Sequence, residues 1–199
     1  MGLIMHRCRV LFVALIVAAA IPYSAIAQNK PEFSAAHLAQ AERLVYAMGM
    51  VESLTLPTKR LISQIRQSDP ARADTMAAGM GPFMEKKYIG LGLREVVAAQ
   101  LDADTCRQLA EHWEGPIGRK FVNTQVQLLT TGKAPQIKFT AAEEAQIKRF
   151  EKTAAFQSYA RAQAAIMQGV AAFAKDTKEK MAQKMEEEAA RRNSGASKN

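Results

Sequence analysis

The sequence predicts an all-α protein, an irregular bundle of about six or seven helices with a long C-terminal helix. Three observations support this fold class. Apolar residues recur every three or four positions through most of the chain, which is the repeat of one helix face. Alternation of apolar and polar residues, which marks a strand, is limited to a fragment at Ile137 and Phe139. No proline follows Pro135, so a long helix is compatible with the remaining sequence.

The first helices are expected between residues 34 and 70. From Ser34 onward one helix face is apolar, formed by Leu38, Ala41, Val45 and Met48. Thr55 and Pro57 predict the start of the second helix, since proline is tolerated in a first turn. Asp69 followed by Pro70 predicts a stop and the N-cap of a third helix.

Glycine and proline divide the middle of the chain. Residues 71–83 are rich in alanine and methionine and contain Gly79-Met80-Gly81-Pro82, which predicts a break or a kink. A further helix is expected from about Phe83 to Leu101. Within it, Gly90 and Gly92 indicate close packing against a neighbouring helix.

Asp102 is expected to cap a short helix with an apolar inner face formed by Cys106, Leu109, Ala110 and Trp113. Gly115 and Pro116 predict the start of the following helix, and residues 130–139 a loop after it. Thr140 and Glu143 then have the spacing of a capping box, in which each side chain binds the other residue's backbone N–H. One or two long helices are expected over residues 140–192.

Residues 1–27 have the three parts of a cleavable signal peptide. Residues His6, Arg7 and Arg9 form a basic start, residues 10–21 are almost all aliphatic, and Ala25-Ile26-Ala27 fits the cleavage pattern of a signal peptidase. We expect cleavage before Gln28 and a periplasmic mature protein, with an uncleaved signal anchor as the alternative. No later segment has the ~20 apolar residues that cross a bilayer, so no transmembrane segment is expected after cleavage.

Three regions follow from this pattern. They are a signal peptide over residues 1–27, a helical domain over 28–174, and a charged helical extension over 175–199 whose end, from Asn193, is a disordered tail. Cleavage removes two of the 27 basic residues and none of the 19 acidic ones, which lowers the net charge from +8 to +6. The basic residues occur in pairs without interleaved aromatic residues, so nucleic acid is not an expected partner, and weak contact with anionic lipid is the functional alternative to a solvated surface.

The sequence lacks the residue patterns of most catalytic and metal sites. Cys8 leaves with the signal peptide, so Cys106 remains alone and no internal disulfide is expected. His37 and His112 are too few for a typical zinc site, and no nucleophile or nucleotide-binding motif occurs. We therefore predict no catalytic residue, no metal and no cofactor. Three methionines recur every four residues, at Met76, Met80 and Met84; they are expected in the core, with copper ligation and a flexible partner groove as alternatives.

Residues 101–120 read LDADTCRQLAEHWEGPIGRK. This stretch resembles the signature of a family of bacterial secreted helical proteins, the domain of unknown function 2059. The positions that match are Leu109, Trp113, Pro116, Gly118 and Lys120, and those that depart are Thr105, Cys106, His112 and Gly115. The resemblance implies a signal peptide and a helical bundle, but no activity.

The candidate binding residues are those of this motif: His112, Trp113, Pro116, Gly118 and Lys120. The leading hypothesis is a non-enzymatic periplasmic protein that binds an envelope protein, or itself, through an apolar helix face. One alternative is a carrier of a small ligand or lipid with a pocket near Trp113. A second alternative is an envelope hydrolase that depends on His112.

Overall fold

The computed structural model of the chain describes residues 32–133 and 135–196. In this part of the chain all regular structure is helical, which confirms the predicted all-α class and the long C-terminal helix. The helices are α2 (Ala35–Ala47), α3 (Met50–Ser68), α4 (Pro70–Met80), the short 3-10 helix η1 (Gly81–Met84), α5 (Lys86–Ala98), α6 (Ala103–Glu114), α7 (Pro116–Thr131), α8 (Ala141–Phe150) and α9 (Ala154–Ala196). The predicted signal peptide lies outside the described residues.

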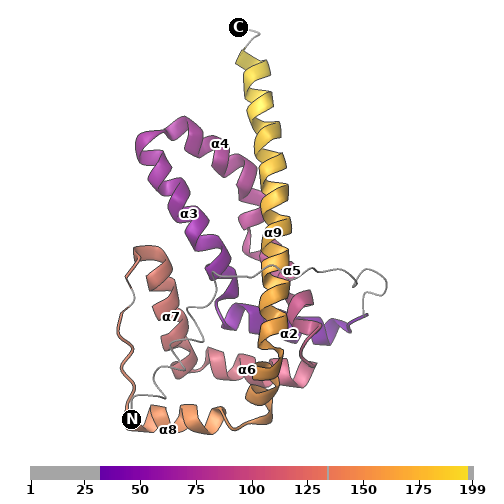
Figure 1. The fold of residues 1–199 in the computed structure, drawn as a ribbon, viewed down its shortest axis with the longest axis vertical. Helices are drawn as coiled ribbons and strands as arrows, with labels where there is room; N and C mark the ends of the chain where they lie inside the picture. Colours follow the sequence, from indigo (N-terminus) through magenta and orange to yellow (C-terminus); the bar gives the residue numbers. More distant parts are fainter. Residues whose placement is uncertain (1–31, 134, 197–199) are drawn as a thin grey trace.

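The molecule is elongated along α9 (Figure 1). At one end, α2 packs against α5 and α6, and the first half of α9 packs against α5 and α6. We call this region the body; its centre is a single apolar cluster that includes Leu44, Val45, Leu93, Leu109 and Trp113. α3 and α4 form a hairpin that extends from the body beside the second half of α9.

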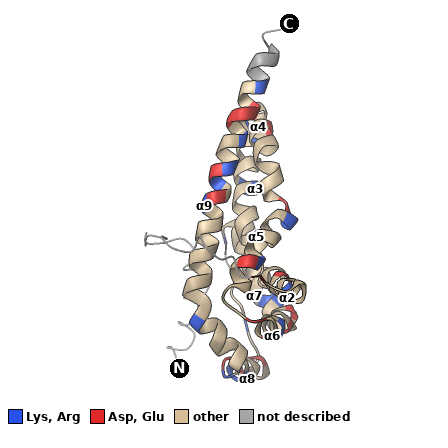
Figure 2. Cartoon of the chain, turned by 90° about the vertical axis from the view of Figure 1, so that its right-hand side faces the viewer, with Lys and Arg blue, Asp and Glu red and all other residues tan. Residues whose placement is uncertain are grey.

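A second, smaller apolar cluster joins this hairpin to α9. Ile62, Ala73 and Met76 are buried in it, and Met80, Met84 and Met185 pack against them. We call this region the arm (residues 62–84 and the part of α9 around Met185). The predicted core position of the methionine stripe is thereby confirmed for Met76, Met80 and Met84. Charged residues of both signs alternate on this half of α9, whereas its first half is nearly free of them (Figure 2).

Local sequence signals place several helix ends correctly. Asp69, Asp102 and Thr140 are N-caps. Their side chains accept hydrogen bonds from backbone N–H groups three residues further along, in the first turn of each helix, at Arg72, Thr105 and Glu143. The capping box of Thr140 and Glu143 is complete. The expected close packing at two glycines is also confirmed: a Cβ on Gly90 would lie 2.4 Å from the Tyr46 hydroxyl, and one on Gly92 would lie 2.0 Å from the Phe173 ring.

Two predicted helix boundaries are wrong. α3 begins at Met50, not near Thr55, and Pro57 lies inside it. Gly49 adopts a left-handed conformation with φ 65°, which lets α2 turn directly into α3 without a polar cap. Pro57 is on the exposed face, while Val51 and Thr55 of the same helix are buried, so packing outweighs the backbone hydrogen bond that proline lacks. The helix expected from Phe83 begins at Lys86, after η1.

α9 is continuous across residue 175, where the sequence suggested that an extension starts, and it ends at Ala196 instead of before Asn193. Its second half packs on α4. Of the helices described, none combines the length and the apolar character needed to cross a membrane.

Candidate functional site

Three of the sequence-predicted binding residues build the corner between α6 and α7. Pro116 is the first residue of α7 and is exposed, and Gly115 before it caps the helix. Gly118, two residues later, is buried, and a Cβ there would lie 2.4 Å from both the Cα and the carbonyl oxygen of Trp113. Trp113 itself is buried in the body. Gly118 is therefore required for the close approach of two helix ends, which is a structural role.

His112 joins α6 to α8. Its imidazole lies flat against the Phe150 ring, with the ring centroids 3.4 Å apart and the planes 2° from parallel. Burial lowers the pKa of His112 below its usual value of 6.5, which favours the neutral ring. The described contacts of the His112 imidazole are ring contacts with Phe150 and Trp113, so the geometry shows a packing role for this side chain.

Lys120 joins α7 to α8. Its ammonium group forms a salt bridge of 2.5 Å with Glu143 and lies 5.7 Å from the centre of the Phe139 ring. The hydrogen bond from Lys120, followed by one from the Thr140 backbone, holds the pKa of Glu143 below its usual value. The motif residues thus meet in one region, where α8 and the preceding loop pack on α6 and α7.

Cys106 lies at the centre of the body. It is fully buried, its thiol is 3.9 Å from the Leu101 carbonyl oxygen, and burial raises its pKa to about 12. The thiol therefore stays protonated and unreactive at ordinary pH. Within the described residues, no group of three histidine, cysteine or acidic side chains is placed to hold a metal ion.

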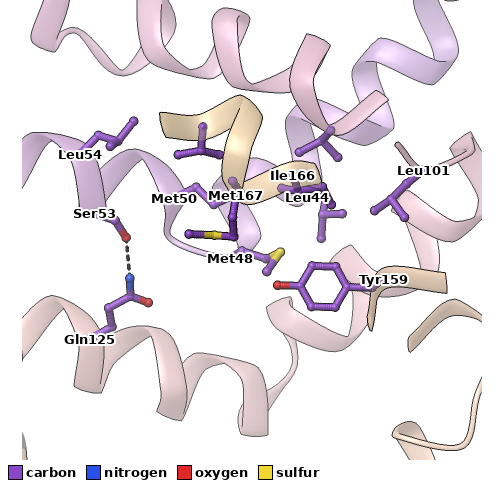
Figure 3. Close-up of a pocket in the computed structure, with 12 residues that line it drawn as sticks. Leu44, Met48, Met50, Ser53, Leu54, Leu101, Gln125, Tyr159, Ile166 and Met167 are labelled. Carbon is purple, nitrogen blue, oxygen red and sulfur yellow. Dashed lines mark hydrogen bonds between the residues drawn. The ribbon is translucent and has the colours of Figure 1, made fainter. Parts of the chain in front are cut away.

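A cavity away from the motif is the best candidate for a binding site. It lies where α2, α3, α5, α7 and α9 meet, is partly open to solvent, and encloses about 50 Å³ (Figure 3). Its apolar lining residues are Leu44, Met48, Met50, Leu54, Val97, Leu101, Ile166, Met167 and Val170. None of the lining residues is charged. An engineered cavity of ~150 Å³ holds benzene, so the enclosed space here takes only the end of a molecule unless side chains move.

Three polar side chains interrupt this apolar lining: Ser53 on α3, Gln125 on α7 and Tyr159 on α9. The amide nitrogen of Gln125 donates a hydrogen bond to the Ser53 hydroxyl, which links α7 to α3. The Tyr159 hydroxyl points toward Met48 in Figure 3. Burial raises the pKa of Tyr159 to about 12, so this hydroxyl stays neutral.

Sequence reasoning missed this cavity entirely. Its lining comes from five helices that span residues 35–196 of the chain, and neither Ser53 nor Gln125 belongs to a recognisable motif. The one available signal is that Ser53 and Gln125 interrupt otherwise apolar faces of their helices, but isolated polar residues on helices are common. None of His112, Trp113, Pro116, Gly118 and Lys120 lines the cavity.

Comparison of the chain with protein-family models, with curated proteins and with solved structures gave no match. The resemblance of residues 101–120 to the domain of unknown function 2059 stays a prediction.

Proposed function

We propose that the protein is a non-enzymatic binding protein of the periplasm whose ligand is a small, mainly apolar molecule. The observation that supports this most directly is the partly open cavity with an uncharged lining. Concave sites with apolar walls and a few placed polar groups are the usual form of small-molecule sites. The periplasmic location depends on the predicted signal peptide.

The side chains around the cavity favour binding over catalysis. Of the described lining residues, only Ser53, Gln125 and Tyr159 carry polar groups, and none of these is a base at neutral pH. Met48, Met50 and Met167 are unbranched and flexible, so they can rearrange around an apolar guest that is larger than the enclosed 50 Å³. This position replaces the pocket near Trp113 as the basis for the carrier hypothesis.

Binding of an envelope protein or a second copy remains the alternative, but the described surface gives it less support. The large apolar side chains exposed on the described surface are Tyr46, Leu61 and Leu128. Scattered exposed apolar residues of this kind are normal on a monomer. The apolar face of α9 is in contact with α5 and α6 in its first half and with α4 in its second.

Filling the cavity tests the proposal. Binding of a neutral apolar dye, N-phenyl-1-naphthylamine, is measured by its fluorescence with the mature protein and with Leu54→Trp, which places a larger ring in the cavity wall. We expect the variant to bind the dye about tenfold more weakly or not at all. Leu61→Trp is the matched control, since Leu61 lies two turns further along α3 and is 47% exposed, and it should bind like the wild type.

Met167→Phe, on α9, provides a second filled cavity if Leu54→Trp does not fold, as judged by circular dichroism. Absence of saturable dye binding by the wild type would rule out the proposal. Equal dye affinity for the wild type and a folded cavity-filled variant would also contradict it, because the dye would then bind elsewhere.

A further inference from the structure

The hydrogen bonds around Ser53 determine how the Gln125 amide is oriented. The Ser53 hydroxyl donates its single hydrogen to the Gly49 carbonyl oxygen, 2.8 Å away in the preceding turn of α3. The Ser53 oxygen is therefore left as an acceptor for Gln125, and only the amide nitrogen of Gln125 can donate to it. The amide oxygen of Gln125 must then point away from Ser53.

This amide oxygen is a buried acceptor without a donor. Among the described residues, none donates a hydrogen bond to Gln125 Oε1, although the atom is buried. A buried carbonyl oxygen without a donor is destabilising, so native proteins seldom contain one. Gln125 lines the cavity, and Figure 3 shows its amide oxygen on the side where Met48 and Tyr159 lie. A small shift of the amide therefore lets a molecule bound in the cavity supply the missing donor.

The rest of the lining defines the remainder of the ligand. An ionised group placed in the cavity would lose its hydration without meeting an opposite charge, since the described lining has none. The ligand is accordingly neutral. Its apolar part contacts the methionine and aliphatic side chains, and the part that exceeds 50 Å³ extends through the open side of the cavity.

We propose that the ligand class is a neutral amphiphile with a hydroxyl group, such as a medium-chain alcohol, whose O–H donates to Gln125 Oε1 while its chain lies on the apolar wall. This inference rests on the proposed function and makes it more specific. It assigns Gln125 as the residue that selects donors, and Ser53 as the residue that orients Gln125.

A pair of isomers tests the hydrogen bond separately from apolar binding. 1-Octanol and heptyl methyl ether have the same composition, but only the alcohol has an O–H donor. Each is used to displace N-phenyl-1-naphthylamine from the mature protein. We expect the alcohol to bind about tenfold more tightly than the ether, because only the alcohol satisfies Gln125 Oε1. Octanoate, the charged counterpart, should bind more weakly than the alcohol.

Gln125→Met removes the acceptor and keeps a side chain of similar length. The variant should bind the ether like the wild type and lose the preference for the alcohol. Gln127→Met, on the exposed side of the same helix, is the matched control and should keep the preference. Ser53→Ala should weaken the preference as well, since it releases the Gln125 amide.

Each outcome separates the two proposals. Equal binding of both isomers by the wild type, with the dye still displaced, overturns the donor inference and leaves the proposed function standing. Tighter binding of the ether or of octanoate overturns it too, as does an unchanged preference in a folded Gln125→Met variant. If the wild type binds neither the dye nor either isomer, the proposed function itself fails.

Discussion

The body and the arm are held together by different kinds of side chain. Of the described residues, sixteen are buried in the cluster of the body and three in that of the arm. The body is filled by branched and aromatic residues such as Leu44, Leu93 and Trp113, which have few rotamers. In the arm, four of the eight residues of the cluster are methionines, which are flexible. The comparison indicates that the body carries most of the stability, whereas the arm is a local unit that can open by itself.

The cavity lies on the body side of this division. Leu44, Val97 and Ile166 of its wall belong to the rigid cluster, while Met48, Met50 and Met167 are of the adaptable kind. A wall that is rigid on one side and adaptable on the other can hold a polar group in place and still admit chains of different length. The arm, by contrast, contributes no lining residue.

The largest expected difference between the two regions concerns buried side chains. Leu109→Ala, in the body, should lower the free energy of unfolding by about 2–5 kcal/mol, because Leu109 is fully buried among rigid neighbours. Met76→Ala, in the arm, should cost only about 1–2 kcal/mol, because neighbouring methionines can fill the space. Urea unfolding, followed by Trp113 fluorescence and circular dichroism, measures both values.

Hydrogen exchange shows which helices lose stability in each variant. Met76→Ala should reduce protection in α4 while α6 keeps it, and Leu109→Ala should reduce protection in both helices. Equal losses of stability for the two variants, with equal exchange in α4 and α6, would show that body and arm unfold as one unit.

Substituting one glycine in each region compares the body with the arm through the addition of a single methyl group. A Cβ on Gly118 would lie 2.4 Å from backbone atoms of Trp113, so Gly118→Ala should destabilise the whole body, by about 3 kcal/mol. A Cβ on Gly79 would lie 2.7 Å from the Met185 side chain and 3.0 Å from its Cα, so Gly79→Ala should push α4 away from α9. We expect that loss to be confined to the arm, about 1–2 kcal/mol by urea unfolding, with Trp113 fluorescence unchanged.

Gly81→Ala is the comparison variant for both, because its Cβ would meet no other segment of the chain within 4 Å, so it measures only the local cost of an alanine before Pro82. If Gly118→Ala proves as mild as Gly81→Ala, then the α6–α7 corner adjusts easily, and the body is less rigid than its packing indicates.

The difference between local and long-range signals explains which features the sequence could predict. The caps at Asp69, Asp102 and Thr140 depend on side chains three residues from the N–H groups they bind, so the local sequence is sufficient to predict them. The start of α3 depends on Gly49 and on the burial of Val51 among distant residues, and it was therefore misplaced at Pro57. Pro57 is compatible with the first turn of a helix, but in the structure it lies inside α3 and does not mark its start.

The cavity could not be predicted for the same reason. Gln125 and Ser53 are 72 residues apart, and only the tertiary packing of α3 and α7 brings them together. The aromatic and glycine motif at Trp113 and Gly118 was visible in the sequence because it builds a tight corner between neighbouring helices. That motif could be recognised because its residues are close together in the sequence, although its role is packing. The residues around the cavity have no regular spacing in the sequence.

The smallest expected effect is a pH dependence that distinguishes the body from the arm. Burial lowers the pKa of His112 in the folded protein below 6.5, so the unfolded chain binds a proton more readily. The stabilising contribution of neutral His112 is complete above about pH 7 and declines as the pH falls below 6.5, toward the folded pKa. The apolar cluster of the arm contains no titratable side chain, so the decline should appear in the body alone.

His112→Phe preserves a ring against Phe150 and removes the proton. Urea midpoints between pH 7.5 and pH 5 should fall for the wild type and stay nearly level for this variant. Carboxylates with lowered pKa values, such as Glu114 and Asp102, lose their contribution only at more acidic pH, because they are still ionised in this interval. Parallel midpoint curves for the two proteins would mean that another group causes the decline, and that the stacked imidazole is as easily protonated in the folded chain as in the unfolded one.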